Sequence, residues 1–250
     1  MNASSCALEA NGLRKTYGRL VAVQDLDLVV AKGEVCCLLG ANGAGKTTTI
    51  NLFLGFHKPD RGTARIDGID VGSKPVEARR RVAYLPETVA LYEKLTGLEN
   101  LTFFDRLGGQ SRGTSELSGI LSNAGLPDEA HARRVSTYSK GMRQKVGIAI
   151  ALAKGAQAVL LDEPLAGLDP SAAKDLGKQI LSLRDRGCGL LMATHDIFRA
   201  RDVADRIGIM MGGRLVQMLD ANELHAREIE DIYMKHLHEV SVGEDREQGS

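Results

Sequence analysis

Three stretches of the chain are apolar almost throughout: EVCCLLG at residues 34–40, AVLL at 158–161 and GLLMAT at 189–194. Runs without alternation are typical of strands buried on both faces of a parallel sheet. Residues 8–30, in contrast, alternate apolar and polar positions and predict short strands. Two further segments predict hairpins, 63–71 around Asp67 and Gly68 and 208–218 around Gly212 and Gly213.

The pattern becomes helical between about residues 88 and 154. Thr96 and Glu99 predict a capping box, and a second helix is expected to run to about Ala124 and stop at Gly125. An amphipathic helix is predicted over 222–240, and a polar, disordered tail over 241–250.

These elements predict one α/β domain over residues 1–240. Its core takes up residues 1–87 and 155–220, and residues 88–154 form an inserted helical lobe.

Composition adds mainly exclusions. The 250 residues include 32 basic and 32 acidic side chains, so charge gives no case for nucleic acid as a partner. The basic cluster at residues 79–81 is more typical of a solvated helix face.

The N-terminus is not that of a secretory signal, and the longest apolar stretch, residues 146–153, is far short of a membrane span. Cys36 and Cys37 adjoin in one strand and are expected to point to opposite faces as small buried hydrophobes.

The segment GANGAGKT, residues 40–47, fits the G-x-x-x-x-G-K-[ST] pattern between a predicted strand and a predicted helix. Gly43 and Gly45 would let backbone N–H groups turn inward around a polyphosphate. Lys46 would bring a positive charge to the β- and γ-phosphates, and Thr47 a hydroxyl to Mg²⁺. The alternative, a plain glycine turn before a helix, is disfavoured by the strand in front.

Two acidic residues end the next buried strand in VLLDEP, residues 159–164. Ligands of open α/β sheets bind at the carboxyl ends of the strands, so Asp162 is expected to hold Mg²⁺ and Glu163 to polarise the attacking water. Alone, the pattern would better fit a strand cap or a salt bridge. His195 ends a third strand, where a contact with the γ-phosphate is expected, and Asp196 is expected to cap the following helix.

A second anion site is suggested by TYSKGMRQKV, residues 137–146. Ser139 stands at the N-cap of a predicted helix, and Gly141 exposes the backbone of its first turn. Such helix ends offer free N–H groups to an anion. The residues alone leave the identity of that anion open.

Seven motifs now stand in a definite order: KTYG at 15–18, GANGAGKTT at 40–48, YLPE at 84–87, YSKGM at 138–142, VLLDEP at 159–164, AGLD at 166–169 and ATHD at 193–196. With this set the chain resembles the ATP-binding subunits of ABC transporters over roughly residues 7–240. The phosphate loop alone would also allow a kinase or a GTPase. The resemblance implies a P-loop RecA-like α/β core with an antiparallel β edge and an inserted all-helical subdomain.

The resemblance also implies roles for the motif residues, with ATP and Mg²⁺ as cofactors. Glu163 matches the catalytic glutamate, His195 the switch histidine and Lys46 the phosphate-binding lysine. Thr47, Asp162 and Glu87 would ligate the metal. The implied nucleotide contacts are Tyr17, Asn42, Gly43, Ala44, Gly45, Lys46, Thr47, Thr48, Ser139, Gly141 and Asp169. Among them Tyr17 would stack on adenine, unless it is only a hairpin-edge residue, and Asp169 would couple two sites across a dimer.

The chain departs from the family pattern in two places. Glu87 stands where glutamine is usual, which adds negative charge beside Asp162 and Glu163. In the signature, usually LSGGQ, Lys140 adds a charge and Met142 removes an amide. The SKGM form resembles that of subunits serving ABC-2 exporters, including drug and antibiotic exporters.

The resemblance implies that two copies, or one copy and a homologous ATPase subunit, pair head to tail around ATP. Residues 40–48 of one copy would then meet residues 139–141 of the other. A separately encoded membrane permease subunit would dock near Glu87 and the helical lobe, which implies a cytoplasmic chain at the inner face of the cell membrane. Two alternatives stay open: a soluble, non-transport ABC-type ATPase, and a nucleotide-dependent regulator with little turnover. The transported substrate is not predicted.

Overall fold

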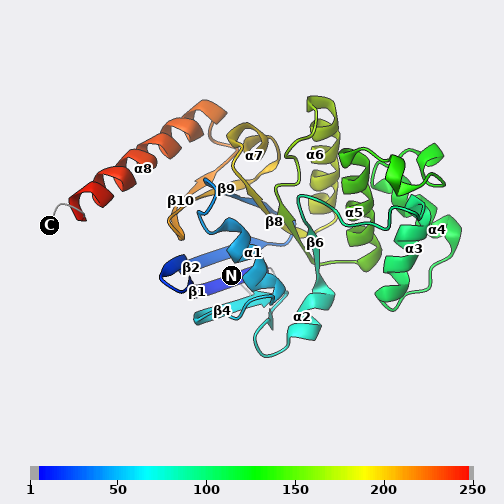
Figure 1. The fold of residues 1–250 in the computed structure, drawn as a ribbon, viewed down its shortest axis with the longest axis horizontal. Coiled ribbons are helices and arrows are strands. Elements are labelled where there is room, and N and C mark those ends of the chain that lie inside the picture. Colours follow the sequence, from blue (N-terminus) through cyan, green and yellow to red (C-terminus); the bar gives the residue numbers. More distant parts are fainter. Residues whose placement is uncertain (1–5, 248–250) are drawn as a thin grey trace.

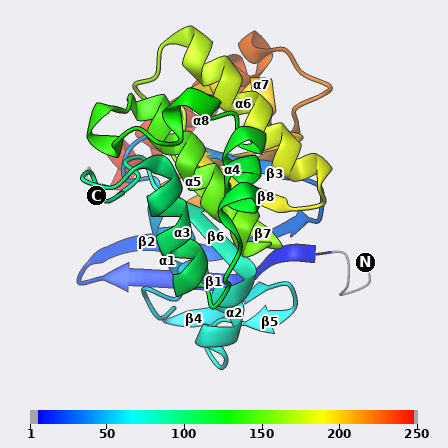
Figure 2. The same cartoon turned by 90° about the vertical axis from the view of Figure 1, so that its right-hand side faces the viewer.

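The computed structural model describes residues 6–247, with side chains described as far as Leu237. Two sheets lie against each other. Four helices gather at one end of the molecule, α3 (Gly97–Leu107), α4 (Thr114–Asn123), α5 (Lys140–Lys154) and α6 (Pro170–Asp185) (Figure 1). Turning the molecule by 90° brings these helices in front of the larger sheet (Figure 2).

The larger sheet has the strand order β10-β9-β3-β8-β7-β6. Its strands are β3 (Val35–Leu39), β6 (Val82–Leu85), β7 (Ala158–Asp162), β8 (Gly189–Thr194), β9 (Arg206–Met211) and β10 (Arg214–Asp220). All pair in parallel except β10 with β9. The three apolar runs became β3, β7 and β8, which lie inside the sheet and are buried nearly throughout. Burial on both faces explains why these runs do not alternate.

The smaller sheet is antiparallel, in the order β2-β1-β4-β5. It comprises β1 (Cys6–Tyr17), β2 (Leu20–Ala31), β4 (Arg61–Ile66) and β5 (Ile69–Asp70). The expected short strands over residues 8–30 are two long ones of 12 residues each. Both predicted hairpins form, β4–β5 around Asp67 and Gly68 and β9–β10 around Gly212 and Gly213.

Residues 88–154 are helical, as predicted, and contain α3, α4 and α5. The helices of the described chain are α1 (Lys46–Leu54), α2 (Pro75–Arg81), α3 (Gly97–Leu107), α4 (Thr114–Asn123), α5 (Lys140–Lys154), α6 (Pro170–Asp185), α7 (Ile197–Val203) and α8 (Ala226–Glu247), with short 3₁₀ turns at Asp128–Ala130 and Val135–Thr137. The capping box at α3 is confirmed, because Thr96 Oγ1 accepts from Glu99 N and Glu99 Oε2 accepts from Thr96 N. The basic cluster at 79–81 lies exposed in the last turn of α2, as expected.

The C-terminal helix differs from its prediction. It begins at Ala226 rather than 222 and continues to Glu247, so most of the predicted disordered tail is helical, and residues 248–250 lie outside the described residues. Ile229 is fully buried, and Ile232, Tyr233 and Leu237 pack against the core from the same helix face. The predicted amphipathic helix is thus confirmed, and only its ends were misplaced. No helix in the described range is long and apolar enough to cross a membrane.

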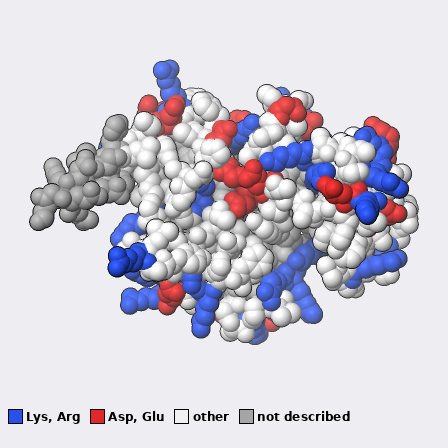
Figure 3. Space-filling model, viewed as in Figure 1, with Lys and Arg blue, Asp and Glu red and all other residues white. Residues whose placement is uncertain are grey.

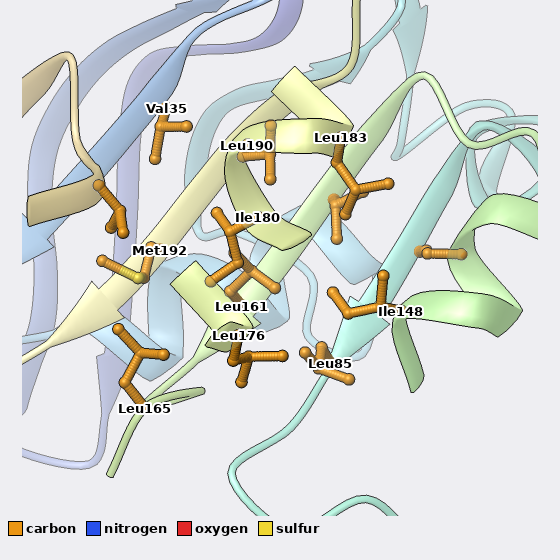
Figure 4. Close-up of a cluster of buried hydrophobic side chains, with 14 of the residues drawn as sticks. Val35, Leu85, Ile148, Leu161, Leu165, Leu176, Ile180, Leu183, Leu190 and Met192 are labelled. Carbon is orange, nitrogen blue, oxygen red and sulfur yellow. The ribbon is translucent and has the colours of Figure 1, made fainter. Parts of the chain in front are cut away.

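Two hydrophobic clusters lie on either side of the larger sheet, and β3 contributes to both. Cys37 belongs to the cluster under α5 and α6, whereas Cys36 belongs to the cluster shared with the smaller sheet and α1. The two cysteines therefore point to opposite faces, as predicted, and burial raises the pKa of the Cys36 thiol to about 12. In the first cluster, side chains of α6 and β8 gather around Leu161, and Ile148 of α5 lies beside Leu85 of β6 (Figure 4). This packing fixes the strand ends that carry the polar motifs.

Candidate active site

The phosphate loop connects β3 to α1. Gly43 and Gly45 have φ angles of +83° and +103°, a backbone conformation that side chains with a Cβ rarely adopt. At Gly45 a Cβ would also lie 2.4 Å from the carbonyl oxygen of Ala22. Both glycines are therefore needed to form the loop, and they bring it to the N-terminus of α1, where free N–H groups and the helix dipole favour an anion.

Lys46 closes the loop from inside. The side chain is 6% exposed, and its Nζ donates to the carbonyl oxygens of Gly40 at 2.6 Å and Ala41 at 3.0 Å. Burial lowers the pKa of Lys46, and the carboxylates of Glu163 and Asp162 oppose that effect. The loop thus holds a cation bound only to neutral carbonyl groups, which a phosphate could neutralise.

Thr47 and Asp162 meet beside this lysine. Thr47 Oγ1 donates to Asp162 Oδ1 at 3.2 Å, across 115 positions of sequence. Burial is the main cause that raises the pKa of Asp162, and the charges of Glu163 and Glu87 add to it. No cluster of three or more His, Cys, Asp or Glu side chains in the described chain could form a metal site alone. One hydroxyl and one half-buried carboxylate nevertheless fit Mg²⁺, which prefers oxygen ligands and takes others from phosphates and water.

Glu163 and His195 lie together at the ends of neighbouring strands. His195 Nδ1 is 2.7 Å from Glu163 Oε1, and Thr194 Oγ1 donates to Glu163 Oε2 at 2.9 Å. The parallel register that pairs Asp162 with Ala193 brings these groups together. Glu163 has a φ of +48°, uncommon for a residue with a side chain, which directs its carboxylate toward β8. The carboxylate is held by two neighbours where a water could be activated.

Sequence reasoning missed two residues that position this site. Thr194 stands inside the ATHD motif, directly before His195, and this position in the motif was the available signal. Arg199 of α7 donates to the carbonyl oxygens of Leu165 and of Leu168, the latter at 3.2 Å. It thereby ties the segment before Asp169 to the helix that follows His195, and no sequence motif indicated this contact.

The two departures from the family pattern contact each other. Lys140 Nζ lies 3.2 Å from Glu87 Oε1, although 53 positions separate the residues. Glu87 was predicted as a metal ligand, and its side chain is 58% exposed and paired with this lysine. Its charge still reaches Asp162, where it contributes to the raised pKa. Glu87 as a ligand therefore stays a prediction, now with a competing partner.

The second anion site stands at the start of α5. Ser139 is the N-cap, and its Oγ accepts from Met142 N at 3.2 Å, as predicted. Gly141 is buried in the first turn. Within the described chain, no hydrogen bond links Ser139 or Gly141 to the phosphate loop. The two predicted anion sites are thus separate features of one chain.

The remaining predicted contacts have varied surroundings. Tyr17 is 41% exposed at the end of β1, with its ring edge-on to His57 and Lys15 Nζ 5.4 Å from its centroid. Asp169 caps α6 by accepting from Ala172 N at 2.9 Å. Asp196 caps α7, as predicted. In the phosphate loop Asn42 is exposed, Ala44 buried and Thr48 half-buried.

The charged side chains on one face of the molecule are unevenly distributed. Acidic side chains form a compact cluster near its middle, and basic side chains lie beside them and along the lower rim (Figure 3). A carboxylate cluster next to a lysine-containing loop suits a ligand that arrives as an anion together with a divalent cation.

The strand–loop–helix phosphate site, with acidic residues at the ends of the adjoining strands, defines a P-loop nucleoside triphosphatase. Comparison with known proteins makes this specific. The ABC transporter family model matches residues 23–166. The chain is 38% identical over 231 residues to the doxorubicin resistance ATP-binding protein DrrA of Mycobacterium tuberculosis, covering 91% of this chain and 70% of that protein. The chain belongs to the ABC transporter family.

Other relatives agree. The bacitracin transport ATP-binding protein BcrA of Enterococcus faecalis is 36% identical, over 88% of this chain and 71% of its own length. The Nod factor export ATP-binding protein I of Bradyrhizobium diazoefficiens is 37% identical, over 85% and 70%.

Among solved structures, the ATP-binding subunit of an ABC transporter superposes with a TM-score of 0.79 at 31% identity, covering 92% of this chain and 98% of that one. A dimeric bacterial ABC transporter cassette superposes with a TM-score of 0.75 at 26% identity, over 86% and 98%. The predicted fold class is confirmed. The protein is an ATP-binding, ATP-hydrolysing transporter subunit that uses Mg²⁺.

Proposed function

We propose that this chain drives export of a small molecule through a separately encoded membrane permease, at the inner face of the cell membrane. Two kinds of observation support the direction of transport: the SKGM signature, and the names of relatives that serve drug resistance, bacitracin transport and Nod factor export. The substrate pocket would belong to the permease.

The observation that carries the proposed chemistry is the contact of Glu163 with His195 beside the Thr47–Asp162 pair. Lys46 and the loop N–H groups would bind the phosphates, while Thr47 and Asp162 would hold Mg²⁺, which offsets phosphate charge when bound. Glu163, held by Thr194 and His195, would accept a proton from the attacking water. His195 would sense the γ-phosphate through its exposed ring.

We further propose that the working unit is a head-to-tail dimer. Within the described residues, no hydrogen bond links Ser139 or Gly141 to the phosphate loop of the same chain. We infer that an ATP held by the phosphate loop of one chain is contacted by Ser139 and Gly141 of a second chain. The dimeric cassette among the structural neighbours supports this arrangement. A permease would then contact the helical lobe and the loop around Glu87, and closure of the dimer would be transmitted to it through these segments.

Replacing Glu163 by Gln tests the assignment. The variant should bind ATP, lose at least about 100-fold in steady-state hydrolysis and accumulate as a dimer with MgATP, because the amide cannot accept the proton. ATPase assays and light scattering measure both effects. Lys178→Gln, which changes an exposed residue of α6, is the control and should retain activity. Full activity of Glu163→Gln would refute the role of Glu163.

A further inference from the structure

The contact between Lys140 and Glu87 links two segments that each belong to a nucleotide site. Glu87 follows β6 and its charge influences Asp162, in the site of its own chain. Lys140 is the first residue of α5, between Ser139 and Gly141, which the proposed function assigns to the ATP held by a second chain. One ion pair therefore joins the half-sites that serve two different nucleotides.

The backbone around this pair is held firmly. Gln144, one helical turn after Lys140, is fully buried and donates from Nε2 to the carbonyl oxygen of Glu87 at 2.9 Å. At Gly147, the next position on that face, a Cβ would lie 2.1 Å from Leu85 Cδ1, so the end of β6 packs directly on the helix. The Glu87 loop and α5 thus form one packed unit, and the parts free to rearrange are the two charged side chains.

The Lys140 ammonium lies where it can change partners. The side chains of Lys140 and Glu87 are 34% and 58% exposed, so water screens their attraction. The ammonium also lies close to Gly167, 3.5 Å from the position that a Cβ would take there. An arriving triphosphate carries more negative charge than one carboxylate and would compete effectively for this cation.

We propose that Lys140 is a cation exchanged between two anions, Glu87 of its own chain in the open state and the triphosphate held by the second chain in the closed dimer. This inference rests on the proposed head-to-tail function. In the open state Lys140 neutralises Glu87 and keeps its carboxylate on α5. Closure transfers Lys140 to the nucleotide and releases Glu87 toward its own Thr47–Asp162 site. ATP binding in the site of the second chain thereby changes the charge beside the Thr47–Asp162 site of the first.

A double-mutant cycle distinguishes exchange from a permanent ion pair. The full chain carrying Glu163→Gln, which prevents hydrolysis, receives Glu87→Gln, Lys140→Gln or both. The ATP concentration that gives half-maximal dimer with Mg²⁺ is measured by light scattering. Exchange predicts that Glu87→Gln lowers this concentration several-fold. It also predicts that Lys140→Gln raises this concentration more in the Glu87→Gln background than when Glu87 is retained, by a further factor of roughly three to ten. With Glu87 retained, Lys140 must first break its contact with that carboxylate, so its net contribution to dimer formation is smaller.

A permanent ion pair predicts the opposite coupling. Lys140→Gln would then raise the ATP concentration for half-maximal dimer only in chains that retain Glu87, because only there does Lys140 have its partner. That result, or an equal effect in both backgrounds, would overturn the proposal. Arg143 and Glu93 form the matched control pair, also 3.2 Å apart and also joining α5 to the preceding segment. Their cycle should show no coupling to dimer formation.

The parent chain separates this inference from the proposed function. If Glu163→Gln alone gives no dimer with MgATP, the head-to-tail function is wrong and the exchange falls with it. If the parent dimerises and the coupling is absent or reversed, only the exchange is refuted.

Discussion

At the scale of single residues, the active site contains groups held in unfavourable states. Asp162 is a carboxylate with a raised pKa because it is buried, and Lys46 is an ammonium with a lowered pKa for the same reason. Glu163 adopts a backbone conformation that costs about 1–3 kcal/mol in general. Such costs cluster at functional sites, where a ligand offsets them.

Asp162 gives a prediction whose sign follows from its pKa. Because the folded state raises this pKa above its usual value, the charged carboxylate destabilises the ligand-free protein at neutral pH, and the penalty disappears as the pH falls through the raised pKa. Asp162→Asn should therefore raise the melting temperature of the ligand-free chain at pH 7.5 by about 2–4 °C. The gain should shrink as the pH falls through the raised pKa of Asp162, because the wild-type carboxyl is then protonated in the folded chain.

The same variant should lose the stabilisation that MgATP gives to the wild type, since Asp162 is a proposed Mg²⁺ ligand. Thermal unfolding with and without MgATP measures both effects. Asp175→Asn, at an acid of α6 whose pKa is lowered by Lys178, serves as the control: it should not raise the ligand-free stability and should leave the MgATP effect unchanged. A lower melting temperature for ligand-free Asp162→Asn would contradict the account of its burial.

At the scale of elements, the close approach of α5 to β6 decides how a glycine responds to substitution. Gly147→Ala adds a good helix former, worth about 1 kcal/mol, but the new methyl would overlap Leu85. Overpacking of this kind costs about 1–3 kcal/mol, so a net loss of stability is expected. Gly119 in α4 has nothing within 4 Å of its added Cβ. Gly119→Ala should therefore stabilise the protein by about 0.5–1 kcal/mol.

Urea unfolding of both variants measures this contrast. Equal effects at the two sites would show that helix propensity, and not the packing of α5 on β6, governs position 147. Because Gln144 holds the Glu87 loop from the same face of α5, Gly147→Ala should also disturb that loop. Faster amide hydrogen exchange at residues 87–89 would show the disturbance.

The elements that sequence predicted best are those whose burial is uniform. β3, β7 and β8 lie inside the larger sheet, so their apolar runs were unambiguous. The strand β6 has four residues and α2 has seven, too few for a period to be recognised. The site was predictable as motifs, because the glycines and Lys46 act through local spacing. Its long-range contacts, Glu163 with His195 and Glu87 with Lys140, depend on strand register and helix packing, which no motif encodes.

At the scale of the whole molecule, the chain carries a phosphate loop and a signature helix that belong to different composite sites in the proposed dimer. Ser139→Arg should leave ATP binding to the phosphate loop intact, because Ser139 only caps α5, at a cost of about 1 kcal/mol. It should abolish hydrolysis by blocking the second chain's nucleotide. Lys46→Ala should also abolish hydrolysis, because its own phosphate loop fails, while its signature remains sound.

Mixing these two inactive variants should restore activity. In an equal mixture about half of the dimers contain one chain of each kind, and each of these has one complete site, made of the Lys46 of one chain and the Ser139 of the other. Activity should therefore rise to at most about a quarter of the wild-type rate. A chain carrying both substitutions, mixed with Lys46→Ala, can form no complete site and should stay inactive. If the first mixture is as inactive as this control, the nucleotide is not shared between two copies of this chain.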